Sequence, residues 1–336
     1  MRVTISDVAR LAGVSTATVS HTINNTRYVS EETKEKVYQA IAELGYTPDA
    51  SARSFRTGKK RTIGFIVPDI SNKFFGTMIE AVENHLSAHG YHLIIANTKE
   101  DAEREENNIR LLSAGLVDGL LIASTMEDFE RFDRLIPAGF PVVLVDRTFE
   151  TKKYSSLCVS NFQPIYRSVC RLAAKGAKRI GIVGGLPRLS STKERISAYQ
   201  QAVADCGLPQ DEKLIRYGDS MENSVQACLD ALLAEKCDAV VVCQGLMASE
   251  TVIYLHQKGI QLAKDIDLVS FVDYDSNFYE LYSSQMDCIV QPVEELGAAA
   301  GEQILSRVEN PEAPVFEKVL TSAYRPYDTP GNWGTK

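Results

Sequence analysis

Apolar residues near the start of the chain recur at helical spacing, in segments separated by turn residues. Helices are predicted over about 5–12, 16–23 and 31–45, with Gly13 in the tight turn between the first two. Ser30 is a good N-cap for the third helix. The apolar positions of the first two helices are Val8, Leu11, Ala12, Val14, Val19 and Ile23. Two short helices joined by a tight turn form a helix-turn-helix, whose second helix lies in the major groove of DNA.

The other face of the second predicted helix carries Thr16, Ala17, Ser20 and His21. A side chain there carries sequence information only if it reaches a base edge. Thr16 offers a hydroxyl and a methyl group, Ala17 can contact a thymine methyl, and His21 can donate to guanine. The alternative is that these are ordinary solvated residues on an exposed face.

After residue 60 the pattern changes to short apolar runs that alternate with amphipathic segments. The runs predicted as strands are Ile63–Val67, Leu93–Ala96, Leu120–Ala123, Val142–Val145, Ile180–Val183, Val240–Cys243 and Leu268–Val272. The segments predicted as helices include Met78–Ala88, Ile165–Ala174, Val225–Ala234 and Val293–Val308. Alternating strands and helices predict a parallel, doubly wound sheet, and there are enough strands for two.

Charge is distributed unevenly along the chain, whose net charge is -8. Residues 1–60 hold nine basic and six acidic residues, a net charge of +3, whereas the remainder holds 27 basic and 38 acidic residues, a net charge of -11. A basic head on an acidic body fits a protein that contacts phosphates at one end only.

Several classes of protein are disfavoured by what the sequence lacks. The first 20 residues do not resemble a signal peptide, and no apolar stretch is long enough to span a membrane. The seven cysteines are scattered, which indicates reduced thiols and a cytoplasmic protein. His85, His89 and His92 have helical spacing, but Gly90 interrupts that helix, so no metal site or cofactor is expected. No catalytic motif is found, so the protein is not expected to be an enzyme.

The segment Val14–Asn24 resembles the recognition segment of the LacI/GalR family of bacterial repressors, nearest to its purine repressor branch. The resemblance continues over nearly the whole chain. Its further motifs are Val29–Thr33, Leu44–Pro48, Ala52-Arg53-Ser54, Ile63-Gly64, Pro68–Asn72, Val117-Asp118-Gly119, Asp146-Arg147 and Gln291-Pro292. The resemblance implies a homodimeric repressor of a carbohydrate-utilisation operon, which binds a palindromic operator and responds to a small-molecule effector.

The implied fold is an all-α helix-turn-helix head on an α/β core of two doubly wound parallel-sheet lobes, as in periplasmic binding proteins. The two lobes are joined by three crossings of the chain. The expected boundaries are 1–48 for the head, 49–60 for a hinge helix and linker, and 61–336 for the core, with one lobe over about 61–160 plus 293–320 and the other over about 162–290 plus 321–336.

The resemblance also assigns DNA contacts. It places Thr16, Ala17 and His21 at base-reading positions, and Ser20, Asn24 and Tyr28 mostly on phosphates. In the hinge, Phe55 stands where the family usually has Leu, and Ala52 is small enough for close approach. An apolar wedge at this position enters the minor groove and kinks the duplex. The alternative for Phe55 is packing on the head or core.

Ligands of doubly wound sheets collect beyond the carboxyl ends of the strands. The effector-binding candidates are Asn72, Phe74, Phe75, Arg147, Arg195, Gln244 and Asp273. Gln244-Gly245 and Val272 replace polar or acidic residues that are common in the family, while Asp146-Arg147, Leu186-Pro187-Arg188 and Arg195 resemble the branch that responds to phosphosugars. Arginines without those carboxylates favour an anionic effector. The alternatives are that Arg147 and Arg188 form a lobe-bridging salt bridge or lie solvated on the surface, and that Phe74 belongs to the core.

The sequence is also compatible with two other hypotheses about the function. One is a regulator controlled by a protein partner, as in the catabolite-control branch, with a degenerate pocket. The other is a solute-binding protein or sugar enzyme that uses the core alone. The sequence does not identify the operator, the effector, the sign of the response, or whether the assembly is a dimer or a tetramer.

Overall fold

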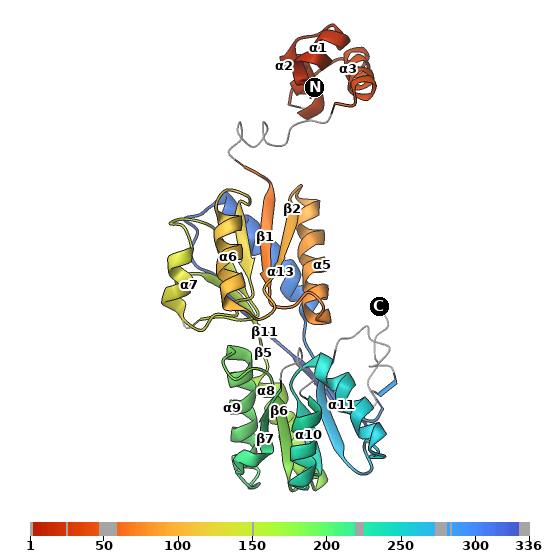
Figure 1. The fold of residues 1–336 in the computed structure, drawn as a ribbon, viewed down its shortest axis with the longest axis vertical. Helices are drawn as coiled ribbons and strands as arrows, with labels where there is room; N and C mark the ends of the chain where they lie inside the picture. The colour runs from red at the N-terminus through yellow and green to blue at the C-terminus, as the bar shows by residue number, and fades with distance from the viewer. Residues whose placement is uncertain are drawn as a thin grey trace. The chain divides into compact units, whose positions relative to one another are not determined.

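The computed structural model describes residues 3–24, 26–46, 59–149, 151–218, 225–272, 281–282 and 284–328. Two compact units divide the chain, Met1–Lys60 and Arg61–Lys336. They are described separately below (Figure 1).

The first unit contains α1 (Ile5–Ala12), α2 (Thr16–Asn24) and α3 (Glu31–Leu44). Its small core is built from one face of each helix: Val8 and Ala9, Val19, and Val37 and Ala40. The backbone of Gly13 has φ +67° and ends α1, which confirms the tight turn predicted there. The side chain of Ser30 accepts a hydrogen bond from the backbone of Thr33, as expected for the N-cap of α3. The helix-turn-helix prediction is therefore confirmed.

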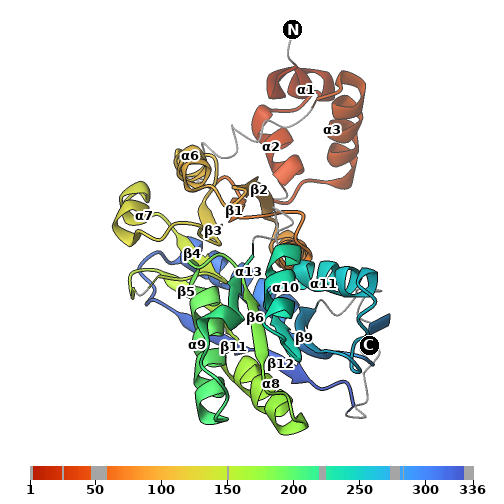
Figure 2. The same ribbon diagram turned by 60° about the horizontal axis from the view of Figure 1, so that its bottom comes forward.

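The second unit contains two six-stranded sheets, each covered by helices on both faces (Figure 2). The first has the order β11-β5-β4-β3-β1-β2, and all its strands are parallel. Its strands are β1 (Thr62–Val67), β2 (His92–Asn97), β3 (Gly119–Ile122), β4 (Val142–Val145), β5 (Ser155–Ser160) and β11 (Glu317–Thr321). Its helices are α5 (Lys73–Ala88), α6 (Ala102–Ser113), α7 (Phe129–Leu135) and α13 (Val293–Glu309). We call this half of the core the first lobe.

The second sheet has the order β12-β10-β9-β8-β6-β7 and defines the second lobe. Its strands are β6 (Ile180–Gly184), β7 (Ile215–Tyr217), β8 (Ala239–Val242), β9 (Asp267–Val272), β10 (Asp287–Val290) and β12 (Ala323–Arg325). Its helices are α8 (Phe162–Lys175), α9 (Ser190–Asp205), α10 (Val225–Ala234) and α11 (Gly245–Gln257), with a short 3-10 turn, η1, at Glu212–Leu214. Only β12 runs antiparallel to its neighbour among these described strands. Two doubly wound lobes confirm the predicted fold class.

The chain passes between the lobes three times, after β5, between β10 and α13, and between β11 and β12. The return of α13 to the first lobe depends on close packing against α5. A Cβ atom on Gly297 would lie 2.7 Å from the carbonyl oxygen of Met78, so only glycine allows this approach. Residues from the end of the sequence thereby complete the first lobe.

Strands were missed where the apolar pattern is weak. Along β5 (Ser155–Ser160) buried and half-buried residues alternate, and half of them are serine, so the segment does not form an apolar run. Conversely, the sequence of β2 is an apolar run, but this strand lies at the edge of its sheet, where Ile94 and Ile95 are 39% and 45% exposed. Apolar content alone therefore does not separate a central strand from an edge strand.

Candidate DNA-binding and effector sites

The predicted DNA-contacting residues of the head lie on the exposed part of α2 and just beyond it. Val19 and Thr22 are buried and anchor the helix. Thr16 and Ala17 are exposed, Ser20, His21 and Asn24 are half-buried, and Tyr28 is 93% exposed. Ala52 and Phe55, the predicted hinge contacts, lie outside the described residues.

Two polar side chains of α2 are already oriented by neighbours. Nδ1 of His21 lies 2.8 Å from the hydroxyl of Thr26, which leaves the other ring nitrogen for a different partner. Nδ2 of Asn24 donates to the carbonyl oxygen of Ser20 at 2.8 Å. These contacts restrict the rotamers of both side chains before any DNA is bound.

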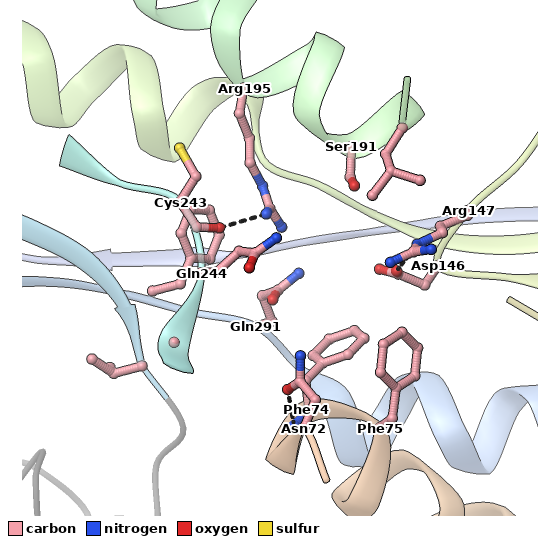
Figure 3. A pocket seen from close by; sticks show the side chains of 14 residues that line it. Asn72, Phe74, Phe75, Asp146, Arg147, Ser191, Arg195, Cys243, Gln244 and Gln291 are labelled. Carbon is pink, nitrogen blue, oxygen red and sulfur yellow. Dashed lines mark hydrogen bonds and ion pairs between the residues drawn. The ribbon is translucent and has the colours of Figure 1, made fainter. Parts of the chain in front are cut away.

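Six of the seven predicted effector-binding residues line one pocket between the two lobes (Figure 3). Its cavity volume is about 70 Å³, and a neighbouring cavity of about 360 Å³ shares Arg147 and Leu189 with it. The seventh candidate, Asp273, lies outside the described residues. The predicted lining residues found in the pocket are Asn72, Phe74, Phe75, Arg147, Arg195 and Gln244.

Most of these side chains reach the pocket because they follow the carboxyl ends of strands, whereas Arg195 lies on α9. Asn72 comes after β1 and caps α5, since its side chain accepts from the backbone of Phe74 at 3.0 Å. Asp146 and Arg147 follow β4, and Asp146 has a left-handed backbone, with φ +66°. Gln244 follows β8 and is the N-cap residue of α11. This placement agrees with the rule for ligand sites in open parallel sheets.

The two phenylalanines have different surroundings. Their rings meet edge to face, with centroids 5.1 Å apart. Phe75 is 3% exposed and belongs to the core of the first lobe, whereas Phe74 is half-buried and only packs against that core. Phe74 therefore presents more of its ring to the pocket than Phe75 does.

Arg147 is neutralised within the first lobe. Its Nη1 and Nη2 donate to the two carboxylate oxygens of Glu100 at 2.8 and 2.6 Å. Burial alone would lower the pKa of this guanidinium, but the carboxylates of Glu100, Asp146 and Glu105 together outweigh burial and raise that pKa. Arg188, from the second lobe, donates to the backbone oxygen of Glu100 at 3.1 Å. The lobe-bridging contact considered for Arg188 is present, and Glu100 is its centre.

Arg195 is buried without such a partner. It is 8% exposed, its Nη1 donates to the carbonyl oxygen of Cys243 at 2.6 Å, and its guanidinium carbon lies 4.1 Å from the ring centroid of Phe271. No carboxylate of the described residues forms an ion pair with it, and its Nε has no hydrogen-bond partner there. Burial lowers the pKa of this guanidinium. A buried cation in this state favours an anionic or strongly accepting ligand.

Other polar groups of the pocket are few. Val272 and Gly245 both line it, so the positions that depart from the family pattern do face the ligand space. The side-chain oxygen of Gln244 is buried and has no hydrogen-bond partner among the described residues. Burial raises the pKa of Asp146, although Arg147 and then Arg195 oppose this effect.

A buried joint connects the three lobe crossings. Asn161, 1% exposed, follows β5, and its side-chain oxygen accepts from Ser322 at 2.7 Å and from Gln291 at 3.5 Å. These three residues come from the three crossings. The carboxylate of Glu194, next to Arg195 on α9, accepts from the backbone N–H groups of Asn161 and Phe162 at 3.2 and 3.3 Å. The joint thus contacts the helix that carries the pocket arginine.

The sequence analysis missed Glu100, Asn161 and Glu194. Glu100 and Arg147 are 47 residues apart, so no local spacing connects them. Lys99 and Glu100 both have left-handed backbones, with φ +53° and +57°. This unusual local conformation is not evident from the sequence.

Two classes of site find no support in the described parts of the chain. No group of three or more His, Cys, Asp and Glu side chains there could hold a metal ion. His85 and His89 instead stack on each other, with ring centroids 4.6 Å apart. None of the described helices is long and apolar enough to cross a membrane.

A helix-turn-helix unit followed by a two-lobed core with an interlobe pocket defines the class of DNA-binding transcriptional regulators with a sugar-binding type of core. Residues 4–49 match the model of the bacterial regulatory proteins of the lacI family. Residues 60–324 match that of the periplasmic binding proteins and sugar binding domain of the LacI family. The chain belongs to the LacI family.

Relatives agree with this assignment. The HTH-type transcriptional repressor PurR of Vibrio atlanticus (strain LGP32) is 34% identical over 321 residues, which cover 94% of this chain and 95% of the relative. The ribose operon repressor of Haemophilus influenzae is 32% identical over 311 residues, or 92% of each. The lac repressor dimer bound to operator and the anti-inducer ONPF has a TM-score of 0.82 at 22% identity, covering 97% and 98%, and supports the fold. The relatives are repressors, which confirms the prediction of a regulator rather than an enzyme.

Proposed function

We propose that this protein is a homodimeric repressor of a carbohydrate-utilisation operon, and that an anionic small molecule, most simply a phosphosugar, controls it from the interlobe pocket. The observation that carries the ligand class is the environment of Arg195, a buried guanidinium with a carbonyl and a ring as neighbours and no described carboxylate. A ligand phosphate or carboxylate would supply the missing charge.

In this proposal the ring of the effector lies against Phe74, and its anionic group lies against Arg195. Arg147 contributes through its position beside Phe75, at 5.9 Å from the ring centroid, rather than as a second free cation, because Glu100 already neutralises it. The small cavity implies that the lobes separate to admit the ligand and close on it.

For DNA binding, two heads matched to a palindrome supply affinity and specificity together. Thr16, Ala17 and His21 would meet base edges, while Ser20, Asn24 and Tyr28 would meet phosphates. Ala52 and Phe55 stay predictions from the sequence, in which Phe55 kinks the duplex. Energy transfer across labelled operator ends tests this, because Phe55→Ala should lose the bend, and an unchanged bend would remove Phe55 from the role of wedge.

A second copy of the chain fits the free edge of the first sheet. The edge strand β2 presents Ile94 and Ile95, and exposed apolar edge strands are normally covered. We infer that the dimer contact includes this edge. Sedimentation with a cognate palindromic duplex should give two chains per operator, and one chain per operator would contradict the proposal.

Affinity for that duplex should fall steeply with salt, because each phosphate neutralised by the head releases counterions. Residues 1–60 carry the net +3 that would do so, while the rest of the chain carries -11. A selected duplex that binds with no salt dependence, or the failure of every selected sequence to bind, would contradict DNA recognition by the head.

A thermal-shift panel of phosphosugars, free sugars and nucleobases tests the effector, since a ligand that binds only the folded state raises the melting temperature. We expect phosphosugars to give the largest shift, and Arg195→Met to reduce it at the same ligand concentration. If a neutral sugar stabilises the protein and its phosphate ester does not, Arg195 holds hydroxyls and the anionic assignment is wrong.

Control by a protein partner is the second candidate, and the small volume of the pocket favours it. In that case no small molecule of the panel would shift the melting temperature. A protein that co-purifies with the full-length chain on operator DNA would then distinguish this candidate from a pocket whose ligand is missing from the panel.

A further inference from the structure

Two cysteine thiols of the second lobe are in contact. The Sγ atoms of Cys170 on α8 and Cys206 at the end of α9 are 3.2 Å apart, and the Cys206 thiol donates to the Cys170 sulfur. All seven cysteines of the chain lie within the described residues. Cys228, Cys237, Cys243 and Cys288 are buried, and Cys158 is half-buried on β5. No other pair of these cysteines is joined by a hydrogen bond between sulfur atoms.

The packing of α8 against α9 imposes this contact (Figure 2). Val169 of α8 and Val203 of α9, each close in sequence to one of the cysteines, belong to the same buried cluster beside the second sheet. Next to the thiols, the hydroxyl of Tyr166 donates to the carboxylate of Asp205 at 2.9 Å. At the opposite end of the helix pair, Glu194 accepts from the first N–H of α8. These two hydrogen bonds and the shared buried cluster hold α8 and α9 in the packing that brings the sulfur atoms together.

Both thiols can also be reached by a small reagent, since Cys170 and Cys206 are each half-buried. This separates them from the four fully buried cysteines. Burial, and next the hydrogen bond to Cys170, raise the pKa of the Cys206 thiol to about 11. The Cys206 thiol is therefore protonated at neutral pH, and an added oxidant is needed to convert it into a disulfide.

We propose that Cys170 and Cys206 are a redox modification site, at which a hydroperoxide converts the two thiols into an intramolecular disulfide. The sulfur of Cys170 attacks the peroxide, the O–O bond breaks and the thiol proton passes to the leaving oxygen, so that a sulfenic acid forms and water or an alcohol leaves. The sulfur of Cys206 then attacks the sulfenic sulfur, the S–S bond forms, and a second water leaves with the hydroxyl oxygen. In total two thiols lose two electrons and two protons, and the peroxide accepts them.

The disulfide would close a loop between residues 36 positions apart and attach α8 covalently to α9. Such a cross-link stabilises the folded lobe, chiefly by restricting the unfolded chain. The affected helix, α9, also carries Ser191 and Arg195 of the pocket. Oxidation would therefore form a disulfide in the lobe that carries the pocket arginine, and a thiol reductant would reduce that disulfide.

The test treats the full-length protein with hydrogen peroxide and then measures intact mass, free thiols and melting temperature. We expect the mass to fall by two hydrogen atoms, two of the seven thiols to disappear, a peptide map to join Cys170 to Cys206, and the melting temperature to rise. Dithiothreitol should reverse all four changes. Cys170→Ser and Cys206→Ser should lose them, while the matched control Cys158→Ser should retain them.

Some results would overturn the proposal. One is a mass gain of one to three oxygen atoms on either cysteine without loss of hydrogen. Others are a disulfide that joins two chains, or equal thiol loss in the wild type and in Cys170→Ser. Mass and peptide mapping report on the bond itself, so the test remains decisive even if one serine variant folds poorly.

Discussion

Each of the two walls of the interlobe pocket contains a buried arginine, and the two arginines have different hydrogen-bond partners and opposite pKa shifts. Arg147 on the first lobe and Arg195 on the second are both 8% exposed. Arg147 makes two hydrogen bonds to the Glu100 carboxylate, whereas Arg195 makes one to a backbone carbonyl. The pKa of Arg147 is raised and that of Arg195 is lowered. Equal burial therefore does not imply an equal role.

Under the proposed function, Arg147 stabilises the fold and Arg195 binds the ligand. Removing one partner of a buried ion pair strongly destabilises the fold, because the other charge stays buried and unpaired. A buried cation without an anionic partner lowers the stability of the free protein. The binding of an anion restores that stability. Among the described residues, the first wall thus contains a complete ion pair, whereas the second contains a cation without one.

The largest effect should come from breaking the first wall. Arg147→Met leaves the half-buried Glu100 carboxylate with only its longer ion pair to Arg188, at 3.6 Å, and we expect it to lower the free energy of unfolding by about 3 kcal/mol, the lower end for a broken buried pair. Urea denaturation of the free protein measures this loss. The double variant Arg147→Met, Glu100→Leu is the control, because removing both charges should restore much of the loss. A single variant as stable as the wild type would show that the pair is not structural.

Breaking the second wall should affect ligand more than fold. Arg195→Met removes a buried cation with no described carboxylate partner, so the stability of the free protein should stay the same or increase. Effector affinity should fall about 10- to 100-fold, since a hydrogen bond to a charged group contributes about 1.5–3 kcal/mol. Calorimetric titration with the effector found by thermal shift measures this. Large destabilisation of the free protein would contradict the comparison.

Two side chains of α2 differ in a similar way, because one keeps a hydrogen-bonding atom for a partner and the other already uses its donor within the helix. Nδ1 of His21 contacts Thr26 and its other ring nitrogen remains for a base, whereas the amide of Asn24 already donates within the helix. His21→Ala should cost about 1–3 kcal/mol of discrimination at one base pair. Asn24→Ala should weaken binding alike on all sequences, because a phosphate contact carries no sequence information. Selection of binding sites with each variant decides this, and identical preference profiles for wild type and His21→Ala would remove His21 from base reading.

The smallest effect concerns pH. Burial raises the pKa of Asp146 above its unfolded value of about 3.9, so ionising this residue costs stability in the folded state. Its contribution is fully present below the unfolded pKa and is lost as the pH rises through the folded pKa. Asp146→Asn tolerates the left-handed backbone and does not titrate. Relative to the wild type, this variant should gain stability as the pH rises above about 4. Parallel stability curves would contradict the assignment.

Local pattern was sufficient for some of these features. The helices of the head follow from apolar spacing and caps within a few residues of each other, and the helical and parallel-strand runs fixed the fold class. Five of the six pocket residues were predicted because each follows the end of a strand, a rule that needs the order of elements and not their contacts, whereas Arg195 was predicted near the start of a helix.

Pairing was not predictable in the same way. Glu100 meets Arg147 across 47 residues, and Asn161 meets Ser322 across 161. Such partners are set by how two sheets and their connections pack, for which spacing along the chain carries no signal. The same limit hid β5, in which Ser155 is buried although serine is not hydrophobic.

The Asn161 joint has a consequence for the genetics of the protein. One side-chain amide receives hydrogen bonds from the other two connections between the lobes, and Glu194 holds its backbone. Substitutions at positions 161, 194 and 322, none of which lines the pocket, should therefore yield alleles that bind operator and effector normally but fail to transmit one event to the other. We expect non-inducible or constitutive alleles with intact binding to concentrate at these three codons. A mutagenic screen in which such alleles scatter evenly over both lobes would show that transmission does not pass through this joint.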